Sequence, residues 1–286
     1  MDIESMDKTM VEIENALRQR ICGQNDGEIL WSMVQYGKRL RPLLCVLSFK
    51  ACGGINGNYG EALDVAAAVE LGHCASLCHD DIVDKDFTRR GHPAFWVENG
   101  ISEALITGHR AISLGLQVSL SHGAEIAETF LEAWDRALIG GSMEAEARRN
   151  RRISTVEYMK IIEYKTASLF AAATKVGSQI ARAPHDIQNL MSEYGMAVGV
   201  AYQLADDLSE LHENKEGELS SIVEWSKVKN SAASISEYLI GEMKAAIEKA
   251  EELSLDKRLP ASKFKPLLGQ VPKYFTELIL GNVVLS

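Results

Sequence analysis

Two clusters of acidic residues carry the clearest chemical signal in this sequence. The first reads Asp80-Asp81-Ile82-Val83-Asp84, and the second reads Asp206-Asp207-Leu208-Ser209-Glu210. On a helix, residues four apart share a face, so Asp80 pairs with Asp84 and Asp206 pairs with Glu210. Largely apolar residues precede both clusters, and carboxylates on a buried helix are costly unless a cation meets them. Solvated helix ends are the simpler alternative, but two matching clusters favour hard divalent cations, Mg²⁺ above all.

Basic residues gather in three further places. Lys38 and Arg41 lie just before Pro42. Arg89 and Arg90 follow the first acidic cluster, and Lys165-Thr166 interrupts an apolar stretch. Most basic pairs are solvated surface, but a lysine among apolar residues needs an anionic partner if it is buried. Carboxylates that hold Mg²⁺, together with separate Lys and Arg groups, suit a diphosphate substrate, whose oxygens metal and guanidinium can share. No GxxxxGK[ST] sequence occurs, which disfavours nucleotide phosphoryl transfer.

Composition indicates a globular chain that does not bind nucleic acid. The 286 residues are 46% hydrophobic and carry a net charge of -10, which argues against nucleic acid as the main partner. We find no apolar stretch long enough for a transmembrane segment and no signal-peptide pattern at the start, so the expected location is cytoplasmic. The five cysteines have no metal or disulfide spacing, and Cys74 and Cys78, one turn apart, are expected to be small core residues.

The periodicity of apolar residues is helical almost everywhere. It predicts helices over 5–20, 28–50, 60–84, 101–118, 122–147, 155–181, 187–211 and 231–254. Glycine- and proline-containing breaks lie between them, and no segment alternates with period two for long enough to predict a sheet. Without a fixed repeat or a low-complexity linker, we expect residues 1–286 to form a single all-α domain.

The order of these motifs resembles that of the trans-isoprenyl (polyprenyl) diphosphate synthases. The resemblance runs from about Gly37 to Glu210 and rests on five motifs in sequence. They are Gly37-Lys38-x-x-Arg41-Pro42; Glu70-x-x-His73 followed by Ser76-Leu77-x-His79-Asp80-Asp81-Ile82-x-Asp84; Arg89-Arg90-Gly91-x-Pro93; Lys165-Thr166; and Tyr202-Gln203-x-x-Asp206-Asp207. The DDxxD motif alone is weak, whereas five motifs in this order and spacing are specific.

The resemblance implies a fold and a set of site residues. The fold would be the isoprenoid synthase fold, a single-domain helical bundle around a deep central cavity, usually as a homodimer. The metal-binding set would be Asp80, Asp81, Asp84, Asp206, Asp207 and Glu210, with Asp80 and Asp84 as the direct Mg²⁺ ligands of the first motif and Asp206 as that of the second. By the same resemblance, Arg89, Lys165, Thr166 and Gln203 would hold an allylic diphosphate, and Lys38, Arg41, His73 and Arg90 would hold isopentenyl diphosphate.

The resemblance also implies a reaction. Mg²⁺ ions and basic groups would draw pyrophosphate from the allylic substrate, and the isopentenyl double bond would attack the resulting cation, with Asp80, Asp84, Lys165 and Asp206 as the catalytic set. The protein would supply positioning, charge stabilisation and exclusion of water. Two other functions stay open. The chain could be a regulatory or non-catalytic subunit of a heteromeric synthase, or an enzyme related to class I terpene cyclases or to diphosphate hydrolases.

Several positions depart from the family pattern. The second acidic motif ends in Glu210 instead of aspartate, and Leu219-Ser220-Ser221 stands where a Gly-Lys pair is usual, with only Lys215 and Lys227 nearby. Gly108-His109, Gly141-Ser142 and Trp96 replace Gly-Asp, Gly-Gln and a histidine. These departures bear on catalytic power more than on the fold.

The residues before the first acidic cluster bear on product length. Steps of four back from Asp80 reach Ser76, Gly72 and Ala68, and Ala75 lies beside Ser76. All four are small, so nothing on this helix would block a growing chain, and we expect a product of C20 or longer, with C15 as the shorter possibility. The alternative is that these residues serve close helix packing. In that case the end of the product cavity would be closed by side chains of another helix, such as Leu105, Ile106 or Ile112.

Overall fold

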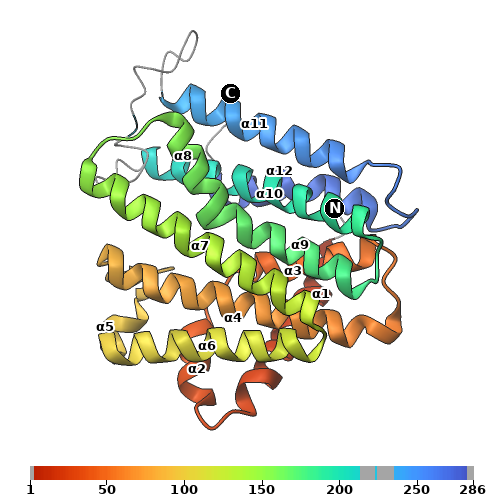
Figure 1. Ribbon diagram of the computed structural model, residues 1–286, viewed down its shortest axis with the longest axis horizontal. Helices are drawn as coiled ribbons and strands as arrows, with labels where there is room; N and C mark the ends of the chain where they lie inside the picture. The colour runs from red at the N-terminus through yellow and green to blue at the C-terminus, as the bar shows by residue number, and fades with distance from the viewer. Residues whose placement is uncertain (1–2, 213–222, 224–234, 282–286) are drawn as a thin grey trace.

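The computed structural model describes residues 3–212, 223 and 235–281. In these residues the regular structure is almost entirely helical (Figure 1), which confirms the all-α prediction. The first half comprises α1 (Ile3–Cys22), α2 (Gly27–Val34), α3 (Leu40–Ala51), η1 (Asn56–Asn58), α4 (Tyr59–Asp84), α5 (Phe95–Asn99) and α6 (Ile101–Ser121). The second comprises α7 (Ala124–Asn150), α8 (Thr155–Ile162), η2 (Glu163–Ala167), α9 (Ser168–Ile180), α10 (His185–His212), α11 (Ile235–Ser254) and α12 (Lys265–Leu280).

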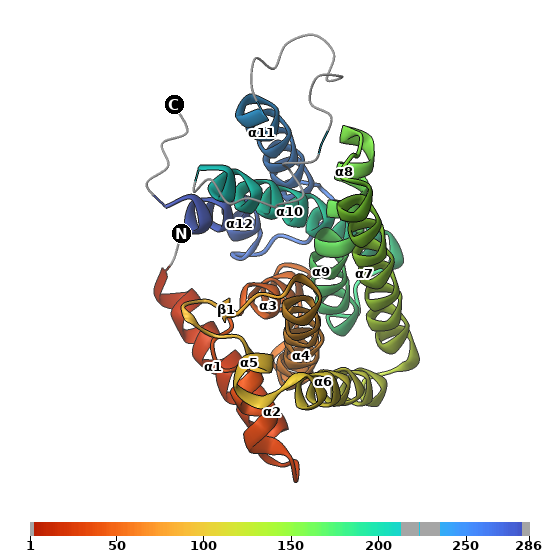
Figure 2. The ribbon, with the colours of Figure 1, turned by 90° about the vertical axis from the view of Figure 1, so that its left-hand side faces the viewer.

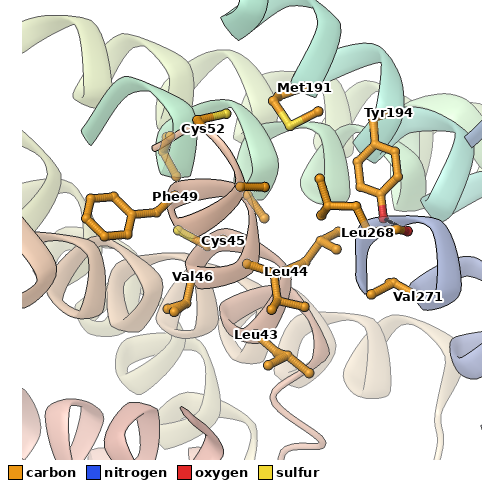
Figure 3. Close-up of a cluster of buried hydrophobic side chains, with 14 of the residues drawn as sticks. Leu43, Leu44, Cys45, Val46, Phe49, Cys52, Met191, Tyr194, Leu268 and Val271 are labelled. Carbon is orange, nitrogen blue, oxygen red and sulfur yellow. Dashed lines mark hydrogen bonds between the residues drawn. The ribbon is translucent and has the colours of Figure 1, made fainter. Parts of the chain in front are cut away.

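Helix α3 lies at the centre of the largest hydrophobic cluster. Its residues from Leu40 to Phe49 are all buried, as expected for a helix that is apolar nearly all round. Figure 3 shows this helix facing Met191 and Tyr194 of α10 and residues of α12. The Tyr194 hydroxyl donates a hydrogen bond to the carbonyl of Leu268, at 2.7 Å, so the one polar group at this contact is satisfied.

The two helices that carry the acidic clusters lie on different sides of this centre. Helix α4 packs against α3, α6 and α9, and α10 packs against α9, α11 and α12. Figure 2 shows α3 and α9 between α4 and α10. The acidic ends of α4 and α10 therefore reach the site from separate helices, as the sequence predicts.

The predicted helix over 28–50 is divided into α2 and α3. The break falls at Arg39, whose backbone is left-handed, with φ of 55°, a conformation that ends regular helix for a non-glycine residue. Pro42 then lies in the first turn of α3, where its missing N–H is tolerated. The break leaves Gly37 and Lys38 in a loop instead of on a helix face.

The sequence did not predict the short hairpin or helix α12. Strands β1 (Thr88–Arg89) and β2 (His92–Pro93) pair antiparallel around Arg90 and Gly91, both with positive φ, as a two-residue hairpin turn of type I′ requires. Helix α12 contains Pro272, which normally breaks a helix, yet its apolar face is buried against the core. None of the helices in the described residues combines the length and the apolar content needed to cross a bilayer.

Candidate functional site

The Lys165-Thr166 pair lies on a π-helical turn that faces both acidic helices. Element η2 joins α8 to α9 without a break, so the predicted helix over 155–181 is continuous but contains one widened turn, a feature frequent at functional sites. Lys165 Nζ lies 2.5 Å from Glu144 Oε2 and 3.7 Å from Asp80 Oδ1. Thr166 donates a hydrogen bond of 2.8 Å to the side-chain carbonyl of Gln203 on α10. This turn therefore connects the α4 side of the site to the α10 side.

Two glycines let neighbouring helices approach this turn closely. A Cβ at Gly140 of α7 would lie 2.5 Å from the backbone nitrogen of Lys165, and a Cβ at Gly199 of α10 would lie 2.5 Å from Cα of Ala167. Both distances are far shorter than a van der Waals contact, and both involve backbone atoms, which cannot rotate away. The absence of a side chain at these two positions thus sets the place of the Lys165 turn.

The charges around Lys165 perturb one another. Burial tends to lower the pKa of Lys165, but Asp80 and Glu144 outweigh it and the pKa is raised, so the lysine stays protonated. Burial would raise the pKa of Glu144, yet Lys165 and Arg148 hold it below its usual value. Burial raises the pKa of Asp80 to about 6, with the charges of Glu144 and Asp84 adding to the effect. The positive charge of Lys165 lowers the pKa of Asp80 but does not offset the effect of burial.

In each acidic cluster the second aspartate turns inward to a protein partner. Asp81, 4% exposed, accepts a hydrogen bond of 2.7 Å from Arg89 Nε. Asp207, 8% exposed, accepts hydrogen bonds from the Tyr158 hydroxyl and from the Gln203 amide, the latter at 2.9 Å. These contacts occupy the carboxylates of Asp81 and Asp207 within the protein.

The remaining acids of the clusters are more exposed than Asp81 and Asp207. Asp80 and Asp84 line one cavity, and Asp206 and Glu210 are partly exposed on α10. In the described residues, no three or more His, Cys, Asp or Glu side chains converge into a ready-made metal group.

A second basic group, apart from Lys165, is formed by Arg41, His73 and Arg90. Arg41 Nη1 lies 2.9 Å from His73 Nε2, and the Arg41 guanidinium stacks 4.2 Å above the ring of Phe170. Burial and the nearby Arg41 lower the pKa of His73 well below its usual value, so the imidazole is neutral. Arg41 Nε and His73 Nδ1 are buried and have no hydrogen-bond partner among the described residues. Buried groups of this kind need a partner, which an anion's oxygens can supply.

The loop before α3 is fixed by Arg39. This side chain is 3% exposed, and it donates to Glu14 on α1, to the Val34 carbonyl and to Glu70 on α4, at 2.9, 2.6 and 3.0 Å. A Cβ at Gly37 would lie 2.0 Å from the Arg39 guanidinium. Lys38, between Gly37 and Arg39, is exposed. The pattern of basic residues predicted Lys38 and Arg41, but not the buried Arg39 that positions them.

The hairpin docks on the same loop. Arg90 Nη1 donates to the carbonyl of Tyr36 at 2.9 Å, and the Tyr36 and His92 rings stack with centroids 3.8 Å apart. The positive charge of Arg90 also contributes to lowering the pKa of Arg41 and that of His73. Three of the four residues predicted for one diphosphate, Arg41, His73 and Arg90, therefore lie near one another, and the fourth, Lys38, is exposed on the loop that Arg90 contacts.

A cavity of about 480 Å³ opens beside the first acidic cluster. Asp80, Asp84 and Lys165 line one part of it, and Ser76 and Trp134 line another. Beyond Trp134 lies a small apolar pocket of about 20 Å³ between α4, α6, α7 and α9. Trp134 and Phe130, both on α7, are among its lining residues. Trp134 thus lines both spaces.

The residues of α4 that line these cavities differ from those expected. Ser76 lines the large cavity and Gly72 the small one, but Ala68 and Ala75 are buried in the cluster with α1, α2 and α6. Each step of four residues drifts about 40° around a helix of 3.6 residues per turn, so three steps leave the original face. Val69 takes the place expected for Ala68.

The alternative floor expected on α6 is also absent among the described residues. Leu105 and Ile106 are exposed, and Ile112 packs against the cluster of α1, α2 and α4. A Cβ at Gly72 or Gly115 would lie 3.1 Å from the Phe130 ring. The two glycines thus form a socket for Phe130, and the aromatic side chains at this depth come from α7.

Two of the departures from the family pattern have a structural explanation. A Cβ at Gly108 would lie 2.3 Å from His79 Nε2, and the His79 and His109 rings lie 5.0 Å apart. Trp96 donates to the carbonyl of Asp86 at 2.8 Å and packs on Phe87, which fixes the segment after the first cluster. The departures at Lys215, 219–221 and Lys227 lie outside the described residues.

The sequence analysis missed two residues that complete the site. Glu144 lies on the buried face of α7 with Ala137, Gly140 and Ala147, and an acid in such a series at helical spacing is a signal that could have been used. Tyr158 is fully buried on α8, but its partner Asp207 is far away in the sequence. Cys74 and Cys78 are buried, as predicted.

A model of the polyprenyl synthetase family matches residues 27–220. The chain is 33% identical over 184 residues to a geranylfarnesyl diphosphate synthase of Methanosarcina mazei, with 64% of this chain and 61% of the relative covered, so the match spans less than two thirds of that relative.

Solved structures of similar fold cover nearly the whole chain. Geranylgeranyl pyrophosphate synthetase of Pyrococcus horikoshii has a TM-score of 0.82 at 24% identity, covering 96% of this chain and 97% of its own. A polyprenyl synthase of Caulobacter crescentus, solved with calcium and isoprenyl diphosphate, has a TM-score of 0.74 at 22% identity, with 96% of each chain covered. The family model, which matches more than half of the chain, settles the assignment: this chain belongs to the polyprenyl synthetase family.

Proposed function

We propose that this chain is a trans-prenyltransferase that condenses an allylic diphosphate with isopentenyl diphosphate. The observation that carries the proposal is the Lys165-Thr166 turn, which reaches Asp80 on one side and Gln203 on the other. Such a turn can hold one diphosphate between two carboxylate pairs. Family membership and the names of the relatives support the same reaction, and we take residues 1–286 to act as one domain.

The allylic diphosphate would bind at the acidic side. Lys165, Thr166, Gln203 and Arg89 are assigned to its oxygens, and the metal would lie between them and the acids Asp80, Asp84, Asp206 and Glu210. The donor set fits Mg²⁺, because it consists of carboxylates and because burial raises the pKa of Asp80, whose charged form a bound cation would stabilise. The calcium in the Caulobacter structure supports a divalent cation in a protein of the same fold.

Isopentenyl diphosphate would bind at the basic group formed by Arg41, His73 and Arg90. Arg41 Nε and His73 Nδ1 are buried there without a partner among the described residues, and Arg90 adds charge from the hairpin. Arginine binds phosphate oxygens in a fixed fork geometry, and neutral His73 can donate one N–H. Lys38, exposed on the loop that Arg39 fixes, would approach the same diphosphate from solvent.

In this assignment the protein performs no covalent chemistry itself. A bound divalent cation would neutralise charge on the leaving pyrophosphate. Lys165 donates to the same leaving group, while Arg41, His73 and Arg90 hold the second substrate with its double bond toward the allylic C1. The C1–O bond breaks, a carbon–carbon bond forms at C1, and the proton lost from the isopentenyl unit passes to the departed pyrophosphate. The apolar cavity excludes water from the cation.

The assay incubates the chain alone with isopentenyl diphosphate, Mg²⁺ and the C5, C10, C15 and C20 allylic diphosphates in turn, and sizes the products. Elongation of at least one allylic substrate supports the proposal. A chain that elongates none of them, but does so when mixed with a second subunit, would indicate the regulatory role. Cyclic or hydrolysed products without use of isopentenyl diphosphate would indicate a cyclase or a hydrolase.

Product length is assigned to the aromatic side chains of α7. Trp134 lies where the large cavity meets the small apolar pocket, and Phe130 fills the socket between Gly72 and Gly115. Replacing Trp134 with alanine joins the two spaces, so we expect Trp134→Ala to lengthen the product, and Ser76→Phe, nearer the acids, to shorten it. The prediction of C20 or longer for the unaltered chain is tested in the same assay, and a C15 product alone would contradict it.

A homodimer is proposed through α6 and α7, which lie along one side of the molecule (Figure 2). Their exposed large apolar side chains are Ile101, Leu105, Ile106, Leu120, Leu131, Leu138 and Ile139. Exposed apolar side chains on two helices that pack together are typical of association sites. Light scattering should give twice the chain mass, reduced by Ile106→Glu with Leu131→Glu but not by Leu255→Glu at an exposed site on another part of the surface. A monomeric wild-type protein would contradict the homodimer. The cytoplasm is the proposed location.

A further inference from the structure

A chain of hydrogen bonds runs from the interior to the Lys165-Thr166 turn. The Tyr158 hydroxyl donates to Asp207 Oδ2, the Gln203 amide donates to Asp207 Oδ1 at 2.9 Å, and Thr166 donates to the Gln203 carbonyl at 2.8 Å. Three separate elements, α8, α10 and η2, contribute to it. The far end of the chain, Thr166, is the residue beside Lys165.

This arrangement fixes the orientation of the Gln203 amide. The side-chain oxygen accepts from Thr166 and the side-chain nitrogen donates to Asp207, so a flipped amide would set its oxygen against the Asp207 carboxylate and lose that bond. Asp207 can orient the Gln203 amide only if the Asp207 carboxylate is itself fixed. The carboxylate oxygen that does not bind Gln203, Oδ2, accepts a hydrogen bond from Tyr158.

Tyr158 is a rigid anchor for that carboxylate. The side chain is fully buried in the cluster formed by α8, α10 and α11. The start of α8 is locked by a capping box in which Ser154 and Glu157 bond to each other's backbone N–H groups. A buried, fully packed donor on a capped helix cannot follow a rotating carboxylate, so it sets the rotamer of Asp207.

We propose that Tyr158 is a positioning residue for the allylic diphosphate: through Asp207 it fixes the Gln203 amide, whose second N–H can donate to a diphosphate oxygen. This proposal rests on the prenyltransferase function proposed above. It gives Asp207 a role in orientation, in place of the metal-binding role expected from the sequence. It predicts that loss of one buried hydroxyl changes binding at one substrate subsite and not at the other.

The experiment compares Tyr158→Phe with Tyr194→Phe. Both tyrosines are fully buried and both hydroxyls donate one hydrogen bond within the core, but Tyr194 bonds to Leu268 between α10 and α12 (Figure 3). Phenylalanine keeps the ring and removes only the hydroxyl. Thermal unfolding should show a loss of stability in both variants, larger in Tyr158→Phe because its partner is a carboxylate, so a general effect of destabilisation appears in both.

Binding is measured by calorimetry with Mg²⁺ and geranyl thiodiphosphate, whose bridging sulfur slows ionisation, and separately with isopentenyl diphosphate. We expect Tyr158→Phe to weaken the allylic analogue about tenfold, the usual effect of one charged-group hydrogen bond, and to leave isopentenyl diphosphate within twofold. Tyr194→Phe should leave both affinities unchanged. In the elongation assay, the allylic KM should rise while the isopentenyl KM does not.

A double-mutant cycle tests whether the effect passes through Gln203. If it does, adding Tyr158→Phe to Gln203→Ala costs little further affinity, because the group that Tyr158 orients is already gone. Equal losses on both backgrounds, or an allylic affinity unchanged by Tyr158→Phe, would overturn the proposal. A wild-type chain that binds the analogue but elongates no substrate would contradict the proposed function, and the binding comparison would still decide the role of Tyr158.

Discussion

Gly140 offers the sharpest test of how the Lys165 turn is positioned. An alanine there would place its Cβ 2.5 Å from the backbone nitrogen of Lys165, 2.8 Å from its Cα and 2.9 Å from its Cβ. An ordinary contact begins near 3.4 Å, so α7 and the turn must separate by close to 1 Å (3.4 − 2.5). No flexible side chain can absorb this shift, because two of the three atoms are backbone.

The expected cost follows from that displacement. A misplacement of about 1 Å in a reacting site lowers the rate by roughly a hundredfold, equivalent to about 2.7 kcal/mol of transition-state stabilisation. Overpacking of this kind also destabilises the fold by about 1–3 kcal/mol. The intrinsic helix propensity works in the other direction, since alanine is favoured over glycine by about 1 kcal/mol in a helix interior.

Gly241→Ala is the matched control. It lies inside helix α11, and a Cβ there meets nothing within 4 Å, so the substitution should stabilise the protein slightly and leave kcat/KM unchanged. Chain-elongation kinetics and thermal unfolding are measured on the wild type and both variants. A folded Gly140→Ala protein with wild-type kcat/KM would refute the argument that this glycine positions Lys165.

Three further predictions follow from the site. Asp80→Asn should lower turnover by at least about a hundredfold in saturating Mg²⁺ with the protein still folded, because a lost charge contact of this kind is worth ~3 kcal/mol. A near-normal turnover rate would contradict a metal-binding role for Asp80. Arg41→Ala should raise the KM for isopentenyl diphosphate about tenfold and more than the allylic KM, since it removes a charged hydrogen-bond donor, and equal rises would show that the two subsites are wrongly divided. Glu144→Gln should destabilise the protein by about 2 kcal/mol at pH 7. Because Lys165 and Arg148 hold the pKa of Glu144 below the ordinary 4.5 against the opposing effect of burial, that difference is present above pH 4.5 and disappears as the pH falls through the folded-state value. Urea unfolding of both proteins across this range measures it, and a difference that persists in acid would contradict the ion-pair assignment.

The sequence predicted the helices whose apolar faces repeat regularly, and it was wrong where a single backbone conformation or a distant contact decides. Helices α4, α7 and α10 follow from periodicity alone. The break between α2 and α3 depends on the left-handed Arg39, a residue type that carries no signal for that conformation. Helix α12 contains a proline that argues against a helix, and only burial of its apolar face against the core accounts for it.

The sequence predicts the residue types of the candidate site, but not the residues that hold them in place. Acidic and basic clusters indicate a diphosphate site because burying their charges without a ligand costs free energy. The groups that hold them, Tyr158 for Asp207 and Glu144 for Lys165, are distant in the sequence from their partners. Steps of four along α4 also misplaced Ala68, because the helical repeat is shorter than four residues. Local spacing therefore predicts the candidate ligands, and tertiary packing decides which of them turn inward.

The ratio of pyrophosphate released to isopentenyl diphosphate consumed tests the proposed function most directly. With the purified chain, Mg²⁺ and an allylic diphosphate, condensation releases one pyrophosphate for each isopentenyl unit incorporated, since each C1–O bond that breaks is replaced by one carbon–carbon bond. We predict a ratio of one at every time point and no release when isopentenyl diphosphate is omitted. Pyrophosphate released without isopentenyl consumption would contradict a prenyltransferase and indicate hydrolysis or cyclisation instead.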